Sequence, residues 1–192
     1  MSPKMIGYQE HVSGLVLIAE DIITSDTGQS DFDIPEGYGS VEWHLYNVHP
    51  VSDNVNLEFQ VNATDDAGGG FDQSQITSTF TAAYLNESGI GGYYIYETGF
   101  DQANGTSYQH IGSYVGNEND ESCSGVLTLY APYSTTYVKQ FTVRINVITQ
   151  NGYTRDVVAG GYINDTTAIS EMSFKFSSGN IDSGTIRMYG AT

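Results

Sequence analysis

The sequence has 192 residues, a length that suits a single domain with a sizeable core. Its 23 acidic and 6 basic side chains give a formal net charge of −17, which excludes a protein that binds nucleic acid through phosphate contacts, because such contacts need Lys and Arg. The single cysteine, Cys123, excludes an intrachain disulfide framework and a cysteine-rich metal site.

Residues 1–30 are predicted to form an N-terminal arm or a first strand, which contains the apolar run "SGLVLIAEDI". They lack the basic start and the small-residue cleavage site of a signal peptide. The apolar runs of the chain are too short to span a bilayer, so we expect no membrane partner.

Two strands are predicted next. The segment 41–48, "VEWHLYNV", places Val41, Trp43 and Leu45 on one face. The segment 55–61, "VNLEFQV", alternates strictly between apolar and polar residues and predicts the cleanest half-buried strand of the chain.

Residues 62–122 are predicted to be loop-rich and variable, because Gly and Asn interrupt their short aromatic runs. Tyrosine is frequent in this region. Its side chain offers a rigid apolar face and a hydroxyl, which suits protein interfaces, sugar contacts and plain packing alike. The candidate interface residues are Tyr93, Tyr94, Tyr96, Phe100, Tyr108 and Tyr114.

Regular alternation returns after residue 124. The segment 139–149, "KQFTVRINVIT", is strand-like, and the Asn-Gly pair of "TQNGY" at 149–153 predicts a hairpin to the following strand. Repeated strand and turn units over the whole length predict an all-β protein, an antiparallel β-sandwich of the jelly-roll-like kind in a single domain over residues 1–192.

The C-terminal segment predicts a second hairpin that closes the sandwich. Phe174 and Phe176 share one face of its first strand, and Ile186 and Met188 share one face of its second. Residues 177–183 would form the turn. Gly179 and Gly184 are the natural positions for a positive φ.

Candidate catalytic groups are sparse. The histidines His11, His44, His49 and His110 are isolated, without the spacing that places two imidazoles on one metal. Among the strand-type acids Glu42, Glu58, Glu97 and Glu171, alternation puts Glu42 and Glu58 on the polar faces of neighbouring strands, where exposed acids are expected anyway. We therefore expect a protein that is not an enzyme.

The acidic loops 64–72 and 117–122 offer oxygen ligands of the kind that Ca²⁺ requires. The weak candidates are Asp65, Asp66 and Asp72, although neither loop has the spacing of an EF-hand. Solvated loop acids are the simpler interpretation, so we expect no cofactor, and a bound Ca²⁺ would order the loop rather than supply chemistry.

Three segments carry a resemblance to a known group of proteins. They are "VEWHLYNVHPVSDNVNLEFQV" at 41–61, "GVLTLYAPYSTTYVKQFTVRINV" at 125–147, and "AGGYINDTTAISEMSFKFSSGNIDSGTIRMYG" at 159–190. Together they resemble small structural proteins of tailed bacteriophages, especially marine ones. The ending that matches "SSGNIxSGxIxxYG" is the most specific part, with Met188 in place of the usual Leu.

The resemblance implies a non-enzymatic virion component, located in the virion as capsid decoration or in association with a tail or fibre. The implied partners are other phage virion proteins and further copies of the chain in a homo-oligomer, for which a trimer is preferred. The alternative is a carbohydrate-binding adhesin that recognises a host-surface glycan, with the rings of 93–100 and Trp43 as stacking faces. A glycan-degrading enzyme would need two carboxylates facing each other in one groove.

Overall fold

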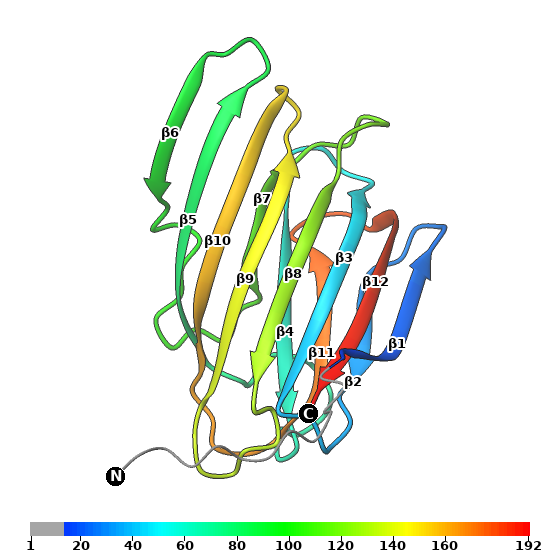
Figure 1. Cartoon of the computed structure of the whole chain (residues 1–192), viewed down its shortest axis with the longest axis vertical. Helices are drawn as coiled ribbons and strands as arrows, with labels where there is room; N and C mark the ends of the chain where they lie inside the picture. Colours follow the sequence, from blue (N-terminus) through cyan, green and yellow to red (C-terminus); the bar gives the residue numbers. More distant parts are fainter. Residues whose placement is uncertain (1–13) are drawn as a thin grey trace, which may run out of the picture.

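Twelve strands make up the regular structure of residues 14–192, the part of the chain that the computed structural model describes. They form an eight-stranded sheet with the order β1-β12-β3-β8-β9-β10-β5-β6 and a four-stranded sheet with the order β2-β11-β4-β7, and every pairing within them is antiparallel. The small sheet lies behind the large one in Figure 1. The predicted all-β sandwich is therefore confirmed. The strand bounds are β1 (Val16–Ile23), β2 (Ser30–Asp33), β3 (Ser40–Pro50), β4 (Val55–Ala63), β5 (Ile76–Asn86), β6 (Gly91–Tyr96), β7 (Gln109–Val115), β8 (Cys123–Tyr130), β9 (Lys139–Ile148), β10 (Tyr153–Ile163), β11 (Ile169–Phe176) and β12 (Ile181–Ala191).

Eight of the strands wrap as a jelly roll. β1 pairs with β12 and β3 with β8 in the large sheet, while β2 pairs with β11 and β4 with β7 in the small sheet. These pairings nest inside one another along the sequence, and successive pairs alternate between the two sheets. This is the arrangement of a jelly roll. The predicted jelly-roll-like architecture follows from this nesting.

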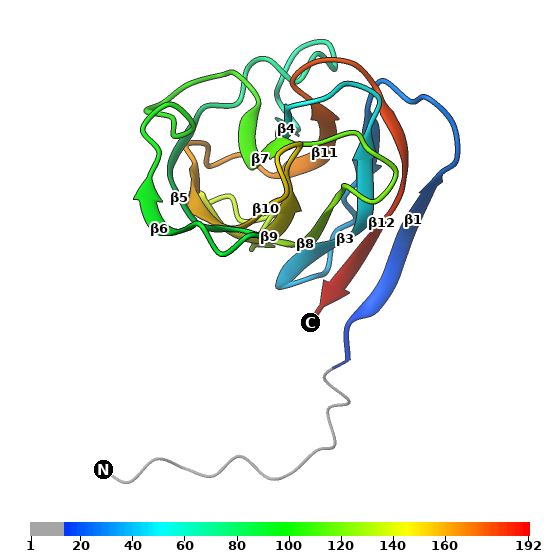
Figure 2. The same cartoon turned by 90° about the horizontal axis from the view of Figure 1, so that it is seen from above.

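The other four strands extend the large sheet beyond the jelly roll. β5 and β6 are inserted between β4 and β7, and β9 and β10 between β8 and β11. They add to the β8 side of the sheet in the order β9-β10-β5-β6. Figure 2 shows that the outer end of this extension, at β6, reaches past the small sheet. We call these four strands the extension.

The core lies between the sheets and is rich in large apolar side chains. Phe59 of β4 meets Phe141 of β9 with ring centroids 5.1 Å apart, and Trp43 of β3 meets Phe174 of β11 at 6.1 Å. Each pair joins one sheet to the other. Full burial of a side chain of this size contributes about 1.5–3 kcal/mol, so these contacts hold the two layers together.

The hairpin between β9 and β10 is confirmed. The amide of Gly152 donates to the carbonyl of Thr149 at 2.9 Å, and the amide of Thr149 donates to the carbonyl of Tyr153 at 3.0 Å. Gly152 has φ +63°, a conformation that glycine adopts without steric cost.

The predicted C-terminal hairpin is wrong. β11 lies in the small sheet, where Phe174 pairs with Phe59, and β12 lies in the large sheet, where Ile186 pairs with Leu45. The segment between the two strands crosses from one sheet to the other. Alternation marks the two strands correctly, but it does not indicate which sheet each one joins. The positive φ expected at Gly179 and Gly184 is found, at +72° and +137°.

The prediction of a half-buried β4 is also wrong, because both faces of this strand are covered. Its polar residues Glu58, Gln60 and Asn62 are buried on the outer face of the small sheet. The Gln60 side-chain amide lies 3.0–3.2 Å from the carbonyl oxygens of Ser74, Thr106 and Ser107 in two loops. Polar residues therefore hold loops onto this face, where simple alternation predicts solvent.

Those loops belong to the region 62–122, which is more regular than predicted, since it also contains β5, β6 and β7. β5 points Ile76, Phe80 and Ala82 into the core. Threonines and a second alanine occupy its other face, so the contrast in hydrophobicity that usually reveals a strand is weak here.

Candidate functional site

The outermost strand of the extension carries three of the predicted interface residues. β6 pairs only with β5, and all of its residues are exposed. The exposed fractions of Tyr93, Tyr94 and Tyr96 are 62%, 74% and 48%. Tyr93 pairs with Tyr84 and packs against its ring at 5.6 Å, whereas Tyr94 pairs with Ala83 on the opposite face of the sheet. We call Gly91–Tyr96 the tyrosine edge.

The tyrosine edge has a free backbone side. The amide of Glu97, just after β6, donates to the carbonyl of Phe80 in β5 at 3.0 Å. Hydrogen-bonding directions alternate along an antiparallel strand, so the amides and carbonyls of Tyr94 and Tyr96 point away from β5. These groups can pair with a further strand.

The edge also lacks charges and prolines, two of the features that usually block such pairing. Native edge strands carry charges, prolines or bulges that discourage contact with another strand. β1, at the other end of the same sheet, has Glu20, Asp21 and a bulge, and β2 has Asp31 and Asp33. β6 has the sequence GGYYIY, with neither charge nor proline. Its pairing with β5 is irregular at Gly91 and Gly92, but it is regular over residues 93–96, which carry the tyrosines.

The other three predicted residues do not join one continuous patch. Phe100 is partly buried and packs on Phe80 at 5.2 Å and on Tyr114 at 5.5 Å. Tyr108 lies over the small sheet, where its hydroxyl donates to Ser173 Oγ at 3.2 Å. The sequence-based prediction therefore combined exposed aromatic residues with aromatic residues that pack within the protein.

Trp43 cannot serve as a stacking face for a sugar. Its side chain is fully buried and packs against Phe174 between the sheets. That part of the adhesin expectation is wrong, because the position of Trp43 on the apolar face of β3 directs its ring into the core.

A row of ionisable residues crosses the outer face of the small sheet. Lys175 of β11, Glu58 of β4 and His110 of β7 occupy paired positions, and His110 Nδ1 lies 3.1 Å from Glu58 Oε1. Burial raises the pKa of Glu58 to about 7, while the Lys175 ammonium acts in the opposite direction. Burial also lowers the pKa of His110. Both groups therefore favour their neutral forms.

The predicted placement of Glu42 beside Glu58 is wrong, since β3 and β4 belong to different sheets. Glu97 forms an ion pair with Arg155 at 2.5 Å, and Glu171 accepts a hydrogen bond from Asn62 at 2.7 Å. Each of these acids has its own structural partner rather than a second carboxylate across a groove.

The described histidines each face a carboxylate. His44 lies 2.9 Å from Glu42, and His49 lies 3.1 Å from Asp182, in addition to the contact of His110 with Glu58. His11 lies outside the described residues.

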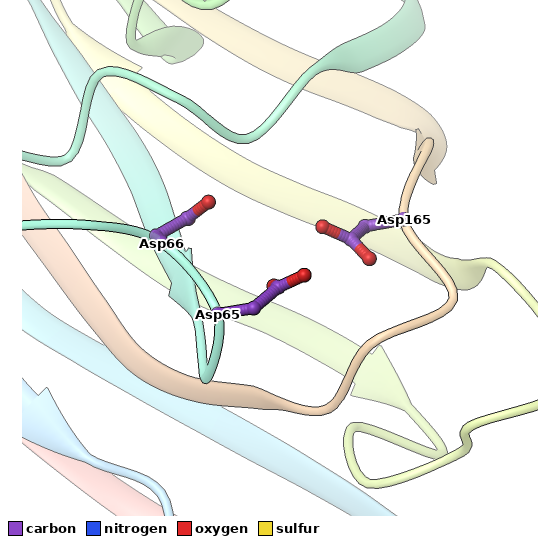
Figure 3. A group of neighbouring side chains, drawn as sticks. All are labelled: Asp65, Asp66 and Asp165. Carbon is purple, nitrogen blue, oxygen red and sulfur yellow. The ribbon is translucent and has the colours of Figure 1, made fainter.

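Two of the three calcium candidates come together with an acid that the sequence did not indicate. One carboxylate oxygen from each of Asp65, Asp66 and Asp165 lies within 4.8 Å of the others, whereas Asp72 is not in this group. Figure 3 shows the three side chains converging from two segments. Asp165 is contributed by the connection after β10, so sequence spacing could not reveal it.

Protein groups already contact these carboxylates. Asp66 accepts hydrogen bonds from the Ala63 amide and from the Ser74 hydroxyl, both at 2.9 Å. The buried ammonium of Lys139 donates to the backbone carbonyls of Asp165, at 3.1 Å, and Thr167. A positive charge thus already lies beside the cluster, and we assign no cation to it.

Sequence reasoning missed a pocket at the base of the extension. Arg155 of β10 projects between the sheets beside the β9–β10 turn and is buried. It borders a cavity of about 300 Å³, which we call the Arg155 pocket. The residues that line it are Asn54, Tyr84, Tyr114, Thr149, Gln150, Asn151, Tyr153 and Arg155.

Cys123 is expected to be chemically inert in the folded protein. Its thiol is fully buried and donates to the carbonyl of Val48 at 3.4 Å. Burial raises the pKa of this thiol to about 12, so the reactive thiolate is almost absent near neutral pH. A colorimetric thiol reagent should detect no thiol before denaturation and one per chain after it. Rapid labelling of the native protein would contradict the buried position of β8.

A comparison with models of known protein families found no match for the chain, and neither did a comparison with curated proteins. Within residues 14–192, no helix is long and apolar enough to cross a membrane.

Proposed function

We propose that the chain is a non-enzymatic structural protein of a tailed-phage virion, exposed on the particle as capsid decoration or in association with a tail or fibre. Its copies assemble with one another through the tyrosine edge. The observation that carries this proposal is the unprotected state of that edge, which combines outward backbone groups with exposed rings at Tyr93, Tyr94 and Tyr96.

An added strand would satisfy both properties of the edge. It would bond to the outward amides and carbonyls, and it would cover the tyrosine rings, which supply rigid contact area at low entropic cost. The favoured occupant is a second copy of the chain. Two molecules of charge −17 repel each other, but the contact strand itself carries no charge that would add to this repulsion.

The oligomeric state tests the assembly. Size-exclusion chromatography with light scattering should give a dimer or a larger closed oligomer for the unaltered chain, with more association as salt screens the net charge. A dimer would indicate that β6 pairs with β6 about a two-fold axis. A trimer would indicate that β6 pairs with a different edge of the next copy.

Two variants distinguish association through the tyrosine edge from nonspecific association through exposed aromatic rings. Tyr94→Pro removes an outward amide without removing a hydrogen bond to β5, and it should give a monomer. Tyr137→Ala removes a ring with the same exposed fraction as Tyr94, 74%, at a distant turn, and it should leave the oligomer unchanged. A monomeric unaltered chain at high salt, or an oligomer that survives Tyr94→Pro, would overturn assembly through β6.

The virion location needs a separate measurement. Mass spectrometry of purified phage particles should find the chain in many copies, and antibodies against it should label intact particles in electron micrographs. Detection only in the lysate, with unlabelled particles, would reject the virion assignment whatever the oligomeric state.

A further inference from the structure

The Arg155 pocket lies where the inserted strands meet the jelly roll. Tyr84 comes from β5, Arg155 and Tyr153 from β10, Tyr114 from β7, and Asn54 from the β3–β4 connection. The β9–β10 turn adds Gln150, so five separate parts of the chain supply the walls of the pocket. This convergence depends on the insertions, because an eight-stranded jelly roll would lack β5 and β10.

The guanidinium at the base of the pocket is rigid and neutralised. Arg155 Nη2 lies 2.5 Å from Glu97 Oε2, and its Nε donates to Ser113 Oγ at 3.1 Å. The guanidinium also lies over two aromatic rings, 5.2 Å from the centroid of Tyr84 and 4.9 Å from that of Tyr114. Arg155 therefore fixes the aromatic walls and leaves little positive charge for an anionic ligand.

The backbone is strained at the pocket wall. Tyr114 has φ +60°, a left-handed conformation that a residue with a bulky side chain rarely adopts. It lies in a bulge, because two pairs of β4 and β7, Val55 with Val115 and Leu57 with Gly112, are separated by one residue on β4 but two on β7. Bulges beside binding sites change the direction of a side chain, and here the bulge brings Tyr114 to the pocket.

The pocket carries polar groups that are not used within the protein. Among residues 14–192, the side-chain amides of Asn54, Gln150 and Asn151 make no hydrogen bond to another residue, and all three are exposed at the pocket. An amide side chain both donates and accepts hydrogen bonds, as a sugar hydroxyl does. Aromatic walls with amides at the rim match a ligand that has apolar faces and hydroxyl edges.

We propose that the Arg155 pocket binds a neutral saccharide unit. An anionic ligand is disfavoured because Glu97 already neutralises Arg155 and the whole chain carries a charge of −17. A purely apolar ligand would leave the amides without partners. The proposal is independent of assembly through the tyrosine edge. It places saccharide binding away from Trp43 and the rings of 93–100, and it includes Tyr114 from the aromatic residues that the sequence singled out.

Saturation-transfer NMR on the full chain can test the proposal with a defined set of probes. We would use the methyl glycosides of glucose, galactose, mannose, rhamnose and N-acetylglucosamine, each at about 10 mM, because a single sugar unit is expected to bind with a millimolar Kd. At least one neutral sugar should receive saturation. Methyl glucuronide, which carries a carboxylate, should bind more weakly than methyl glucoside.

Two amide variants place the binding in the pocket. Asn54→Gly with Gln150→Ala should weaken binding about tenfold, because it removes two side-chain amides at positions where the backbone tolerates the change. The matched control, Gln140→Ala, removes an exposed amide on the outer face of β9 and should have no effect. The proposal is overturned if none of the neutral probes receives saturation, if only the glucuronide does, or if the double variant binds as well as the control.

Discussion

Replacing Gly161 by alanine is expected to lower the free energy of unfolding by about 3 kcal/mol. Gly161 lies in β10, where this strand runs between β9 and β5. A Cβ atom at this position would lie 2.1 Å from the backbone oxygen of Thr77 and 2.7 Å from the Cα of Ser78. Backbone atoms of a paired strand cannot move aside as a flexible side chain can, so the two strands must separate locally.

The preceding glycine provides a matched control. A Cβ at Gly160 would have its nearest contact at 3.4 Å, with the carbonyl oxygen of Phe141, which is an ordinary van der Waals distance. Gly160→Ala should therefore be close to neutral, or slightly stabilising, since alanine restricts the unfolded chain. Urea unfolding should show a lower midpoint for Gly161→Ala alone, with the same slope. Equal midpoints for the two variants would contradict the close approach of β10 to β5.

The fold class could be predicted because several strands alternate clearly between apolar and polar residues. Val41, Trp43 and Leu45 were expected on one face of β3, and all three are buried in the core. The jelly-roll-like architecture could be predicted, but the sheet that each strand joins could not. Which sheet a strand joins depends on pairings between distant segments, such as Ile186 with Leu45, and local alternation carries no information about them.

The surfaces of the extension could be predicted in part. The run of tyrosines in β6 is visible in the sequence, and its exposure follows from its place at the end of the sheet. The Arg155 pocket could not be predicted, because its residues come from segments that meet only in the fold. The sequence contained one signal of this pocket. Arg155 occupies the same face as the buried Val157 and Ala159, and a charge at such a position indicates a buried ionic partner.

The buried position of Glu58 predicts a large effect of pH on stability. Its pKa is about 7 in the folded protein and 4.5 in the unfolded chain. The folded state therefore keeps a proton that the unfolded state loses as pH rises above 4.5. The contribution of Glu58 to the free energy of unfolding is therefore largest below pH 4.5. It decreases as pH rises and levels off once pH passes about 7. From these two pKa values, the loss is on the order of 3 kcal/mol.

His110 acts in the opposite direction. Its pKa is lowered by burial. The unfolded chain therefore binds a proton at His110 as pH falls below about 6.5, before the folded protein does, and the contribution of His110 to the free energy of unfolding, complete above that pH, is lost. The contact at 3.1 Å between His110 Nδ1 and Glu58 Oε1 couples the two groups, and they titrate as a pair. The two effects oppose each other where they overlap, below about pH 6.5, so the clearest loss of stability of the unaltered protein should come as pH rises from about 6.5 to 7, where only Glu58 still titrates.

Glu58→Gln separates the two contributions. Glutamine has nearly the same shape and stays neutral, so the variant should be more stable than the unaltered protein by about 3 kcal/mol near pH 8, with the advantage disappearing near pH 4.5. Only the loss from His110 at acidic pH should remain. Glu42→Gln is the matched control, because Glu42 also lies in a strand but is only half-buried. Urea unfolding across this pH range measures both variants. A Glu58→Gln protein that is less stable than the unaltered one near pH 8 would show that attraction between ionised Glu58 and Lys175 outweighs the cost of burying the carboxylate.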